Sequence, residues 1–287
     1  KLAPTDSADV ANALGLKDGY EIDGAVLQHP GDESTLELVQ WIRPYNPESA
    51  YAVPVNHFGI HRMAFATSDI EADVAVLKAQ GVEFVSEPTT APNGERFVFL
   101  KDQDGTFLKL IEESGTPATA GPDLVRLVNT NMNVADLERS REFYRLLGFT
   151  EEEDGAQAGS GDFAAAHGFD DPIEFEGVDV SLPGTGAPFG GDDEATLQLR
   201  QWKTPFNGAP PYSPPVNHLG IDRIAFFVDD LNAAMDEMNR LGFEQLGPIG
   251  GGASVGGVGI VFFYDPDRIK VELWGPVSEV NPNSSCD

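Results

Sequence analysis

The sequence is poor in basic residues. Lys and Arg together number 18, against 47 Asp and Glu, so the 287-residue chain carries a formal net charge of -29 at pH 7. A surface this acidic repels phosphate groups, which argues against nucleic acid and anionic membrane surfaces as partners. It favours cationic ligands, and it also serves solubility in a salty or exported environment.

Cysteine and long apolar runs are nearly absent as well. The single cysteine, Cys286, stands one residue from the last position, so we expect neither an intrachain disulfide nor a cysteine-based metal site. No apolar run approaches the roughly 20 residues that cross a bilayer, which predicts a soluble protein, either cytoplasmic or exported. The first residue is Lys1 rather than Met, which suggests that a signal peptide, a tag or another N-terminal segment was removed or left out.

A tandem duplication is the main feature of the sequence. A shift of 161 residues aligns "PVNHFGIHR" at 54–62 with "PVNHLGIDR" at 215–223 without a gap, and it places Arg62 on Arg223. The same shift places Trp41 on Trp202. Shifts of 153 upstream and 163 downstream extend the match over most of each half. Such self-similarity indicates that the two halves repeat one fold.

Each half is built from a smaller unit. Strand patterns near 62–67, 125–133 and 223–228 each lead through an Asp into an amphipathic helical stretch, and two or three further strand patterns follow. The unit is β-α-β-β-β, with three complete copies. Residues 1–48 correspond only to its back half, so either the leading strand and helix are absent from this sequence or the first unit is built incomplete.

Strand, capped helix and a turn before the last strand recur in this order in the units, in the motifs "NMNVADLERSREFYRLLGF" (131–149), "GIDRIAFFVDDL" (220–231), "YDPDRIKVELW" (264–274) and "KDQDGTFLKLI" (101–111). The sequence thereby resembles the vicinal oxygen chelate superfamily, which includes glyoxalase I, bleomycin-resistance proteins and extradiol dioxygenases. The resemblance implies an α+β fold in which tandem β-α-β-β-β units pair into two cups. It also implies a divalent metal on each concave face, held by His, Glu or Gln from the first and last strands.

The Gly- and Pro-containing stretch "ESGTPATAGPD" suits a linker between two domains. We expect a first domain at 1–118, made of the partial first unit plus the second unit, and a second domain at 119–276. A disordered tail is expected at 277–287. The protein is predicted to be a monomer or a homodimer.

Arginine stands where the resemblance places a metal-binding His. The two positions are Arg62 and Arg223, and Asn129 is assigned to the same place in the third unit. A guanidinium stays protonated and has no lone pair to give to a metal. Strand alternation puts each Arg beside small residues on the face away from the helix, which suits a concave pocket.

The carboxylate position of the last strand falls on Glu272 in the fourth unit and on Lys109 in the second; repeat alignment adds Glu37 and Gln198. One interpretation keeps Glu272, Gln198 and Glu37 as ligands of Fe, Mn, Ni or Zn. The favoured one has no cofactor: Arg223 pairs with Glu272, and Arg62 or Lys109 pairs with Glu37, where a metal would sit.

Three functions remain open. The favoured hypothesis is a bleomycin-resistance-like protein that binds a small, aromatic molecule in a cup whose usual metal-ligand set is broken. The alternatives are a metal-dependent lyase or extradiol-type dioxygenase with an atypical site around Glu272, and a non-catalytic structural or interaction protein. His57 and His218 are expected to anchor loops, and the Trp residues either stack on a ligand or belong to the core. The candidate ligand-binding residues are Arg223, Asn129, Trp202, Trp274, Arg62 and Trp41.

Overall fold

The computed structural model describes residues 7–28, 35–47, 54–113, 115, 124–182, 195–210, 214–252 and 257–277. Within these ranges, no helix is long and apolar enough to cross a membrane. Most of the expected linker, and the expected disordered tail apart from Val277, lie outside the described residues.

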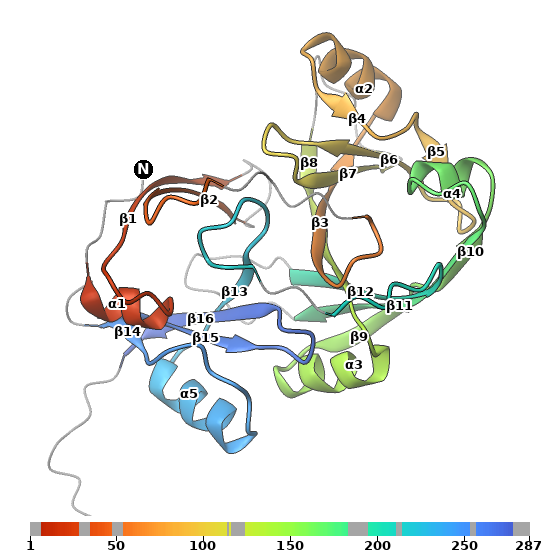
Figure 1. Ribbon diagram of the computed structural model, residues 1–287. Coiled ribbons are helices and arrows are strands. Elements are labelled where there is room, and N and C mark those ends of the chain that lie inside the picture. Colours follow the sequence, from red (N-terminus) through yellow and green to blue (C-terminus); the bar gives the residue numbers. More distant parts are fainter. Residues whose placement is uncertain are drawn as a thin grey trace, which may run out of the picture.

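Helices and strands follow one another as the repeat predicts (Figure 1). The elements of the first and second units are α1 (Ala8–Ala13), β1 (Glu21–Gln28), β2 (Thr35–Arg43), β3 (Gly59–Thr67), α2 (Ile70–Ala79), β4 (Glu83–Phe84), β5 (Thr89–Thr90), β6 (Arg96–Lys101) and β7 (Phe107–Glu112). Those of the third and fourth units are β8 (Leu124–Asn133), α3 (Leu137–Leu146), β9 (Thr150–Asp154), β10 (Gln157–Gly159), α4 (Asp162–Ala166), β11 (Ile173–Leu182), β12 (Ala195–Thr204), β13 (Arg223–Phe227), α5 (Leu231–Arg240), β14 (Gly250–Gly252), β15 (Val258–Tyr264) and β16 (Lys270–Pro276).

The three long helices begin at the aspartates that the sequence marks as caps. The side chains of Asp69, Asp136 and Asp230 accept hydrogen bonds of 3.0, 3.1 and 3.1 Å from the backbone N–H three residues further on. Each cap satisfies one of the N–H groups that the first turn of a helix leaves without a partner. The short helices α1 and α4 were not predicted, because five or six residues are too few to show a helical period.

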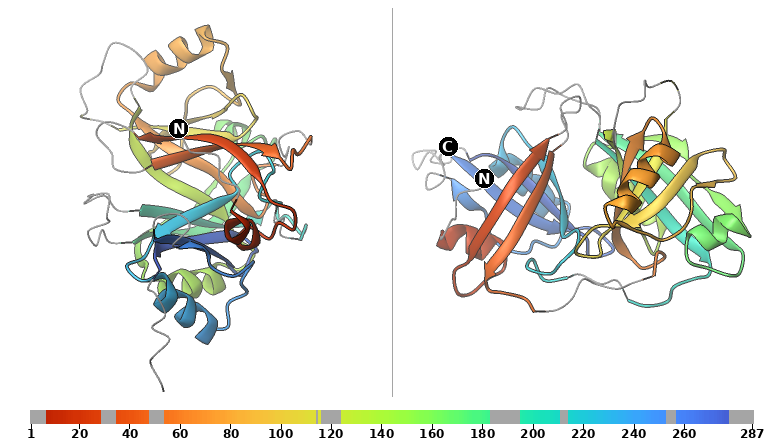
Figure 2. Two further views of the ribbon diagram at one scale, coloured as in Figure 1. Left: turned by 90° about the vertical axis from the view of Figure 1, so that its left-hand side faces the viewer. Right: turned by 90° about the horizontal axis from the view of Figure 1, so that it is seen from above.

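Hydrogen bonding joins the second unit to the third. Strand β3 pairs with β7 on one side and antiparallel with β8 on the other, within a sheet ordered β10-β11-β12-β8-β3-β7-β6-β4. Strands β5 and β9 join the same sheet through β6 and β11, and the other strands form a four-stranded sheet, β13-β16-β15-β14, and the separate hairpin β1-β2. Figure 2 shows the hairpin facing the four-stranded sheet on one side of the molecule and the larger sheet curling on the other.

The units therefore do not pair in the order in which they follow one another along the chain: the second unit pairs with the third. We call the curl of the second and third units the first cup, and the pair formed by the first and fourth units the second cup. The expected domains at 1–118 and 119–276 combined the first unit with the second and the third with the fourth. In the structure, β3 of the second unit is hydrogen-bonded on one edge to β7 of its own unit and on the other edge to β8 of the third unit. No edge of β3 is left for the first unit, which instead packs α1 against β14 and the following strand. The limits of the domains themselves stay a prediction.

The apolar core lies between the sheets and the long helices. On the outer side of β13, Ile224 packs with Leu231 and Met238 of α5, and on the outer side of β3, Phe65 packs with Ile70 of α2. This is the face that strand alternation predicts for the helices. The concave face of the first cup instead combines polar side chains with a second apolar cluster, which includes Phe97, Phe99, Phe163 and Phe175.

The repeated Pro-Val-Asn-His segments hold the two halves together. Asn56 Nδ2 donates to the carbonyl of Pro205 at 2.9 Å, and Asn217 Nδ2 donates to the carbonyl of Pro44 at 3.0 Å. Each repeat thus ties its loop to the other repeat in a reciprocal way. His57 and His218 each hydrogen-bond through Nδ1 to the carbonyl of the next residue, at 2.7 and 2.6 Å, which confirms their predicted role in anchoring loops.

Candidate functional site

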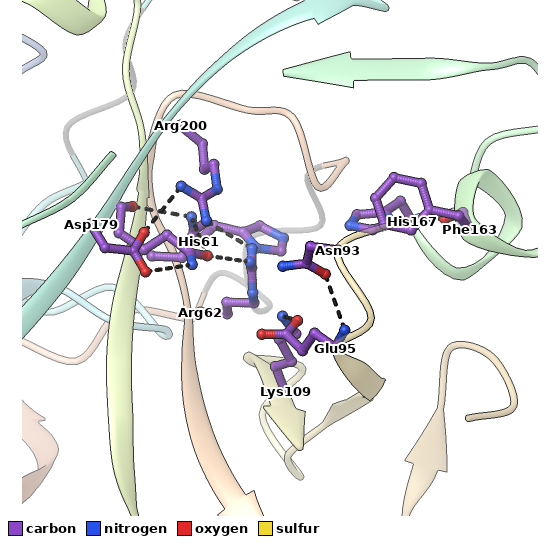
Figure 3. Close-up of polar contacts among 11 residues, drawn as sticks. His61, Arg62, Asn93, Glu95, Lys109, Phe163, His167, Asp179 and Arg200 are labelled. Carbon is purple, nitrogen blue, oxygen red and sulfur yellow. Dashed lines mark hydrogen bonds and ion pairs between the residues drawn. The ribbon is translucent and has the colours of Figure 1, made fainter. Parts of the chain in front are cut away.

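The first cup contains a cavity of about 100 Å³. It opens between β3, β6 and β7 on one side and β11, β12 and α4 on the other (Figure 3). The side chains that line it are mostly polar or charged. The lining residues are Arg62, Ala91, Asn93, Glu95, Phe97, Lys109, Gly155, Gln157, Phe163, His167, Phe175, Asp179, Gln198 and Arg200.

A row of polar side chains crosses four strands at the base of this cavity. Arg62 of β3 lies in register with Asn131 of β8, Asn131 with Gln198 of β12, and Gln198 with Asp179 of β11. Register alignment places side chains of neighbouring strands side by side on one face. The row therefore continues across the junction between the second and third units.

Arg62 is the buried centre of the row. Its Nη1 donates to Asn131 Oδ1 at 2.8 Å, and its Nη2 donates to Gln198 Oε1 at 3.0 Å. The guanidinium also lies 5.1 Å from the ring centre of Phe99. Its Nε is buried and has no hydrogen-bond partner among the described residues. Burial, followed by the charge of Arg200, lowers the pKa of Arg62 to about 9, so the group is still protonated at neutral pH.

Lys109 and Arg200 bring two more positive charges to the cavity wall, each with a carboxylate. The Lys109 ammonium pairs with Glu95, and burial lowers the pKa of Lys109 to about 8. Arg200 Nη1 lies 3.2 Å from Asp179 Oδ1. Both cationic side chains are over nine-tenths buried, so the charges act in an environment of low dielectric constant.

Two glycines make room for Arg200. A Cβ atom on Gly155 would lie 1.9 Å from Arg200 Nη1, and one on Gly177 would lie 2.3 Å from the same atom and 2.7 Å from the Leu199 carbonyl. Contacts this short do not occur, so any other residue would push the guanidinium out of its place. The glycines are thus part of what positions this cation.

His167 closes the cavity at the end of α4 without adding charge. Its Nδ1 bonds to the carbonyl of Phe163 at 2.8 Å, and its ring packs 5.0 Å from that of Phe99. Burial lowers its pKa to about 3, although the hydrogen bond to Phe163 opposes this shift. The imidazole is therefore neutral at physiological pH.

The second cup has the repeat-equivalent arginine in a different setting. Arg223 pairs with Glu272 through Nε, as the sequence predicted, and its Nη2 lies 3.0 Å from Glu37 Oε2. Asp222 lies 3.4 Å from Nη1 and also pairs with Lys270 at 2.7 Å. Although burial acts to lower it, Glu272, Asp222 and Glu37 raise the pKa of Arg223 above its ordinary value.

The residues at the expected metal positions do not fit a divalent metal. In the first cup these positions hold Arg62 and Lys109, whose charges repel a dication, and the Gln198 oxygen already accepts from Arg62. In the second cup the carboxylates of Glu37 and Glu272 are engaged by Arg223. Among the described residues, no group of three or more His, Cys, Asp or Glu is arranged to hold a metal ion.

The tryptophans that were candidates for ligand stacking are not among the residues that line the cavity, although Trp202 packs behind Phe175 of its wall, with ring centres 5.2 Å apart. Trp202 is buried and donates from Nε1 to Asn133 Oδ1 at 3.1 Å. Trp41 packs near Tyr20, with ring centres 6.1 Å apart, and Trp274 packs against Phe227 at 4.9 Å. Their positions match the core alternative that the sequence left open.

Asn129 is buried but is not the residue of β8 that lies in register with Arg62. It lies in register with Ala64, and its Oδ1 has no hydrogen-bond partner among the described residues. Asn131, two positions further along β8, faces Arg62 instead. Alternation places both asparagines on one face of the strand, so the sequence indicated the face but not the register.

Other site residues were missed for different reasons. Arg200 shares a face of β12 with the candidate Gln198, which was a usable signal. Asp179 lies opposite Gln198 only because of the pairing of β11 with β12. Glu95 lies in the turn before β6, and no local pattern connects it with Lys109.

A smaller cavity of about 80 Å³ lies where the two repeats meet. His57 and His61 line it from one repeat, and His218 and Lys270 line it from the other. His61 stacks on Phe107 at 4.9 Å, and burial holds its pKa well below its usual range. This cavity lies at the reciprocal loop anchors rather than at the base of a cup.

The fold and the site together define a class of protein in which paired β-α-β-β-β units form cups with a polar base, here with an arginine at the centre of each. A model of the Glyoxalase/Bleomycin resistance protein/Dioxygenase superfamily matches residues 12–110 and 126–273. The chain belongs to this superfamily.

The individual proteins that this chain resembles share 26% or less of their aligned sequence with it. A lactoylglutathione lyase of Schizosaccharomyces pombe is 26% identical over 218 residues, which make up 75% of this chain and 66% of that protein. A mutant of glyoxalase I from Zea mays superposes with a TM-score of 0.57 at 21% identity, covering 88% of this chain and 80% of that one. A second structure, of glyoxalase I from Zea mays, gives 0.55 at 19% identity, covering 95% and 83%. At these identities the structural likeness concerns the fold alone.

Proposed function

We propose that this chain is a metal-independent member of the superfamily that binds a small molecule in its first cup. The observation that carries the proposal is the cavity of about 100 Å³ at the base of that cup, with Arg62 and Lys109 in its wall. These cations stand at the positions where the resemblance implies a metal. They provide fixed positive charge and N–H donors where a metal would provide a Lewis acid.

Aromatic rings supply the apolar part of the site. Phe97, Phe163 and Phe175 line the cavity, and Phe163 lies at the α4 end together with His167 (Figure 3). Rings at the wall of a polar cavity suit a ligand that has a flat apolar portion. Support for a flat ligand thus comes from these three phenylalanines and not from the tryptophans.

The second cup is assigned a structural role. Arg223, Glu272 and Glu37 link β13 and β16 to the hairpin β1-β2, which shares no strand pairing with them. A metal-dependent lyase or dioxygenase centred on Glu272 would first have to displace Arg223 from this carboxylate. Breaking a buried ion pair is costly, so we place the ligand in the first cup.

Chelator-treated protein, purified without a His tag, provides the test. Small aromatic acids and amides are screened by thermal shift, and each hit is titrated by calorimetry with and without EDTA. We expect binding that EDTA does not change, and elemental analysis of protein not treated with chelator should give no stoichiometric Fe, Mn, Ni or Zn. Stoichiometric metal together with binding that disappears on chelation would contradict the proposal.

A pair of alanine variants locates the site. Ala91 is buried in the cavity wall, so Ala91→Leu fills part of the space and is expected to weaken binding. Ala79→Leu, at an exposed position near the end of α2, is the matched control and should bind as the wild type does. Equal loss in both variants would place the ligand elsewhere.

A further inference from the structure

The charges in the wall of the first-cup cavity do not balance. Among the described residues that line it, Arg62, Lys109 and Arg200 are cationic and Glu95 and Asp179 are anionic. The remaining titratable residue there, His167, is neutral. The described lining of the cavity therefore carries one positive charge more than its own carboxylates neutralise.

The excess charge is located on Arg62. Glu95 pairs with Lys109, and Asp179 pairs with Arg200. The hydrogen bonds of Arg62 go to the amide oxygens of Asn131 and Gln198, with a 3.2 Å contact to His61 Nδ1, and none goes to a carboxylate among the described residues.

Arg62 also has an unused donor. Its Nε is buried without a partner in the part of the chain that the structure describes, while the side chain is 7% exposed. A buried cation without a counter-charge is costly, and so is a buried N–H without an acceptor. A ligand oxygen that carries negative charge and contacts the part of Arg62 lining the cavity would provide the missing counter-charge.

We infer that the first cup takes a small organic monocarboxylate, whose carboxylate provides the counter-charge for Arg62. The inference rests on the proposed function, because it names the chemical class of the ligand that the cup binds. A single negative charge matches the single uncompensated positive charge. A planar carboxylate also suits the planar fork of a guanidinium.

The cavity limits the rest of the ligand. A volume of about 100 Å³ admits a molecule of few heavy atoms, and the amides of Asn93, Gln157 and Gln198 line it beside the charged groups. These amides can exchange hydrogen bonds with a hydroxyl or keto oxygen, while Phe97 and Phe163 can contact a short apolar portion. The ligand class is therefore a compact acid, such as a hydroxy acid or a small aromatic acid.

The strongly negative net charge does not prevent such binding. The formal charge of -29 belongs to the whole chain, and exposed charges are screened beyond about 8 Å at physiological ionic strength. The cations of the cavity are buried and act on a ligand at contact distance, where screening is weak. The general expectation that an acidic surface favours cationic ligands therefore does not apply inside this cup.

The second cup lacks the excess positive charge that is found in the first cup. Arg223, at the equivalent position of the repeat, already faces three carboxylates within ion-pair distance. With Lys270, its surroundings carry two positive and three negative charges, so an added anion would be repelled. The inference therefore predicts one anion site per chain and places it at Arg62.

Calorimetry at pH 7 with chelator present tests the inference with four probes and one reference anion. The probes are glycolate and benzoate, with their uncharged counterparts glycolamide and benzamide, and the reference is inorganic phosphate. We expect at least one carboxylate to bind and its amide to bind roughly tenfold to a hundredfold more weakly, the range given by losing a charged hydrogen bond. Phosphate should bind more weakly than that carboxylate, because at pH 7 much of it carries two charges.

Variants of Arg62 test whether this residue causes the preference for carboxylates over amides. Arg62→Gln should reduce carboxylate affinity by a similar factor and leave amide affinity unchanged, while Arg62→Lys should retain part of the carboxylate preference. Arg240→Gln, which removes an exposed arginine outside both cups, is the control for the loss of one positive charge. Urea denaturation of each variant verifies that the folded state is populated.

The results of these measurements distinguish failure of the carboxylate specificity from failure of the proposed small-molecule binding. Amides that bind as tightly as carboxylates, with no effect of Arg62→Gln, would overturn the inference and leave a small-molecule site in the cup. Preferred binding of phosphate would overturn the carboxylate class. If the acids, the amides and the aromatic compounds of the wider screen all fail to bind, the proposed function itself fails.

Discussion

Replacing Arg62 and Arg223 by Met, one at a time, should have very different effects on stability. The two arginines are equivalent in the repeat, and Met retains much of the side-chain volume without charge. Arg223 is neutralised by nearby carboxylates, whereas the partners of Arg62 among the described residues are neutral. We therefore expect Arg223→Met to be strongly destabilising and Arg62→Met to be nearly neutral or stabilising.

The expected loss of stability in Arg223→Met follows from Glu272, whose carboxylate loses its partner. The side chain of Glu272 is 10% exposed, so removing its partner leaves a buried charge that must be desolvated or protonated. Loss of one partner of a buried ion pair costs about 3–5 kcal/mol. Glu37, at 43% exposure, can return to solvent and adds little.

Two contributions to the free energy of unfolding oppose each other in Arg62→Met. Its pKa falls from 12.5 to about 9, which corresponds to a penalty of about 5 kcal/mol on the charged form, and this penalty disappears in Arg62→Met. The amide oxygens of Asn131 and Gln198 lose their donors, which costs about 1–3 kcal/mol each. The net change should therefore lie between about 3 kcal/mol of stabilisation and about 1 kcal/mol of destabilisation.

Urea denaturation at pH 7, followed by tryptophan fluorescence, measures both free energies of unfolding. Urea is chosen because it is uncharged and does not screen ion pairs. The slope of the free energy with urea concentration should stay the same in both variants, so that the midpoints report stability. A loss for Arg62→Met equal to or larger than that for Arg223→Met would refute the reasoning.

Three further predictions concern the framework around the cup. Burial raises the pKa of Asp265 to about 7, so its contribution to stability is fully present below pH 4 and is lost as the pH rises through 7. Between pH 5 and 8 the free energy of unfolding, measured with urea, should therefore fall by about 2–3 kcal/mol less in Asp265→Asn than in the wild type. Gly177→Ala should cost about 1–3 kcal/mol in urea denaturation and weaken carboxylate binding in calorimetry, because a Cβ displaces Arg200 and meets a backbone carbonyl. Asp136→Ala should cost about 1 kcal/mol in the same urea assay, through loss of the helix cap, and leave ligand affinity unchanged.

These predictions have matched controls. Gly208→Ala places a Cβ 3.5 Å from Phe206, an ordinary contact, and should change neither stability nor binding. An equal loss in Gly208→Ala and Gly177→Ala would contradict the role given to Arg200. An Asp265→Asn variant with the same pH dependence as the wild type would show that this buried carboxyl does not titrate as described.

Much of the fold could be predicted because it depends on local patterns that occur more than once. The Asp caps, the strand alternation around Arg62 and Arg223, and the repeated Pro-Val-Asn-His segments are each readable within a short window, and the structure contains all of them. The reciprocal bonds of Asn56 and Asn217 also explain why the asparagine occurs in both copies.

The pairing of the units could not be predicted, because it depends on hydrogen bonds between strands far apart in the sequence. Chain order suggested that Arg62 or Lys109 would pair with Glu37, but the pairing of β3 with β8 places Arg62 against Asn131, and Lys109 pairs with Glu95. The same pairing brings Gln198 to Arg62 and leaves Glu37 to Arg223. The sequence thus indicated on which face of their strands Arg62 and Arg223 lie, whereas the partners of both residues required the structure.

Arg62 and Arg223 are equivalent in the repeat, but only Arg223 is neutralised by carboxylates among the described residues. A nitrogen-15 NMR titration of chelator-treated protein with benzoate or glycolate tests this difference most directly, following the arginine Nε–H signals, which Arg62→Gln and Arg223→Gln serve to assign. The Arg62 signal should shift and saturate while the Arg223 signal stays in place. A shift of Arg223 with Arg62 unmoved, or shifts that appear only after a divalent metal is added, would contradict this prediction.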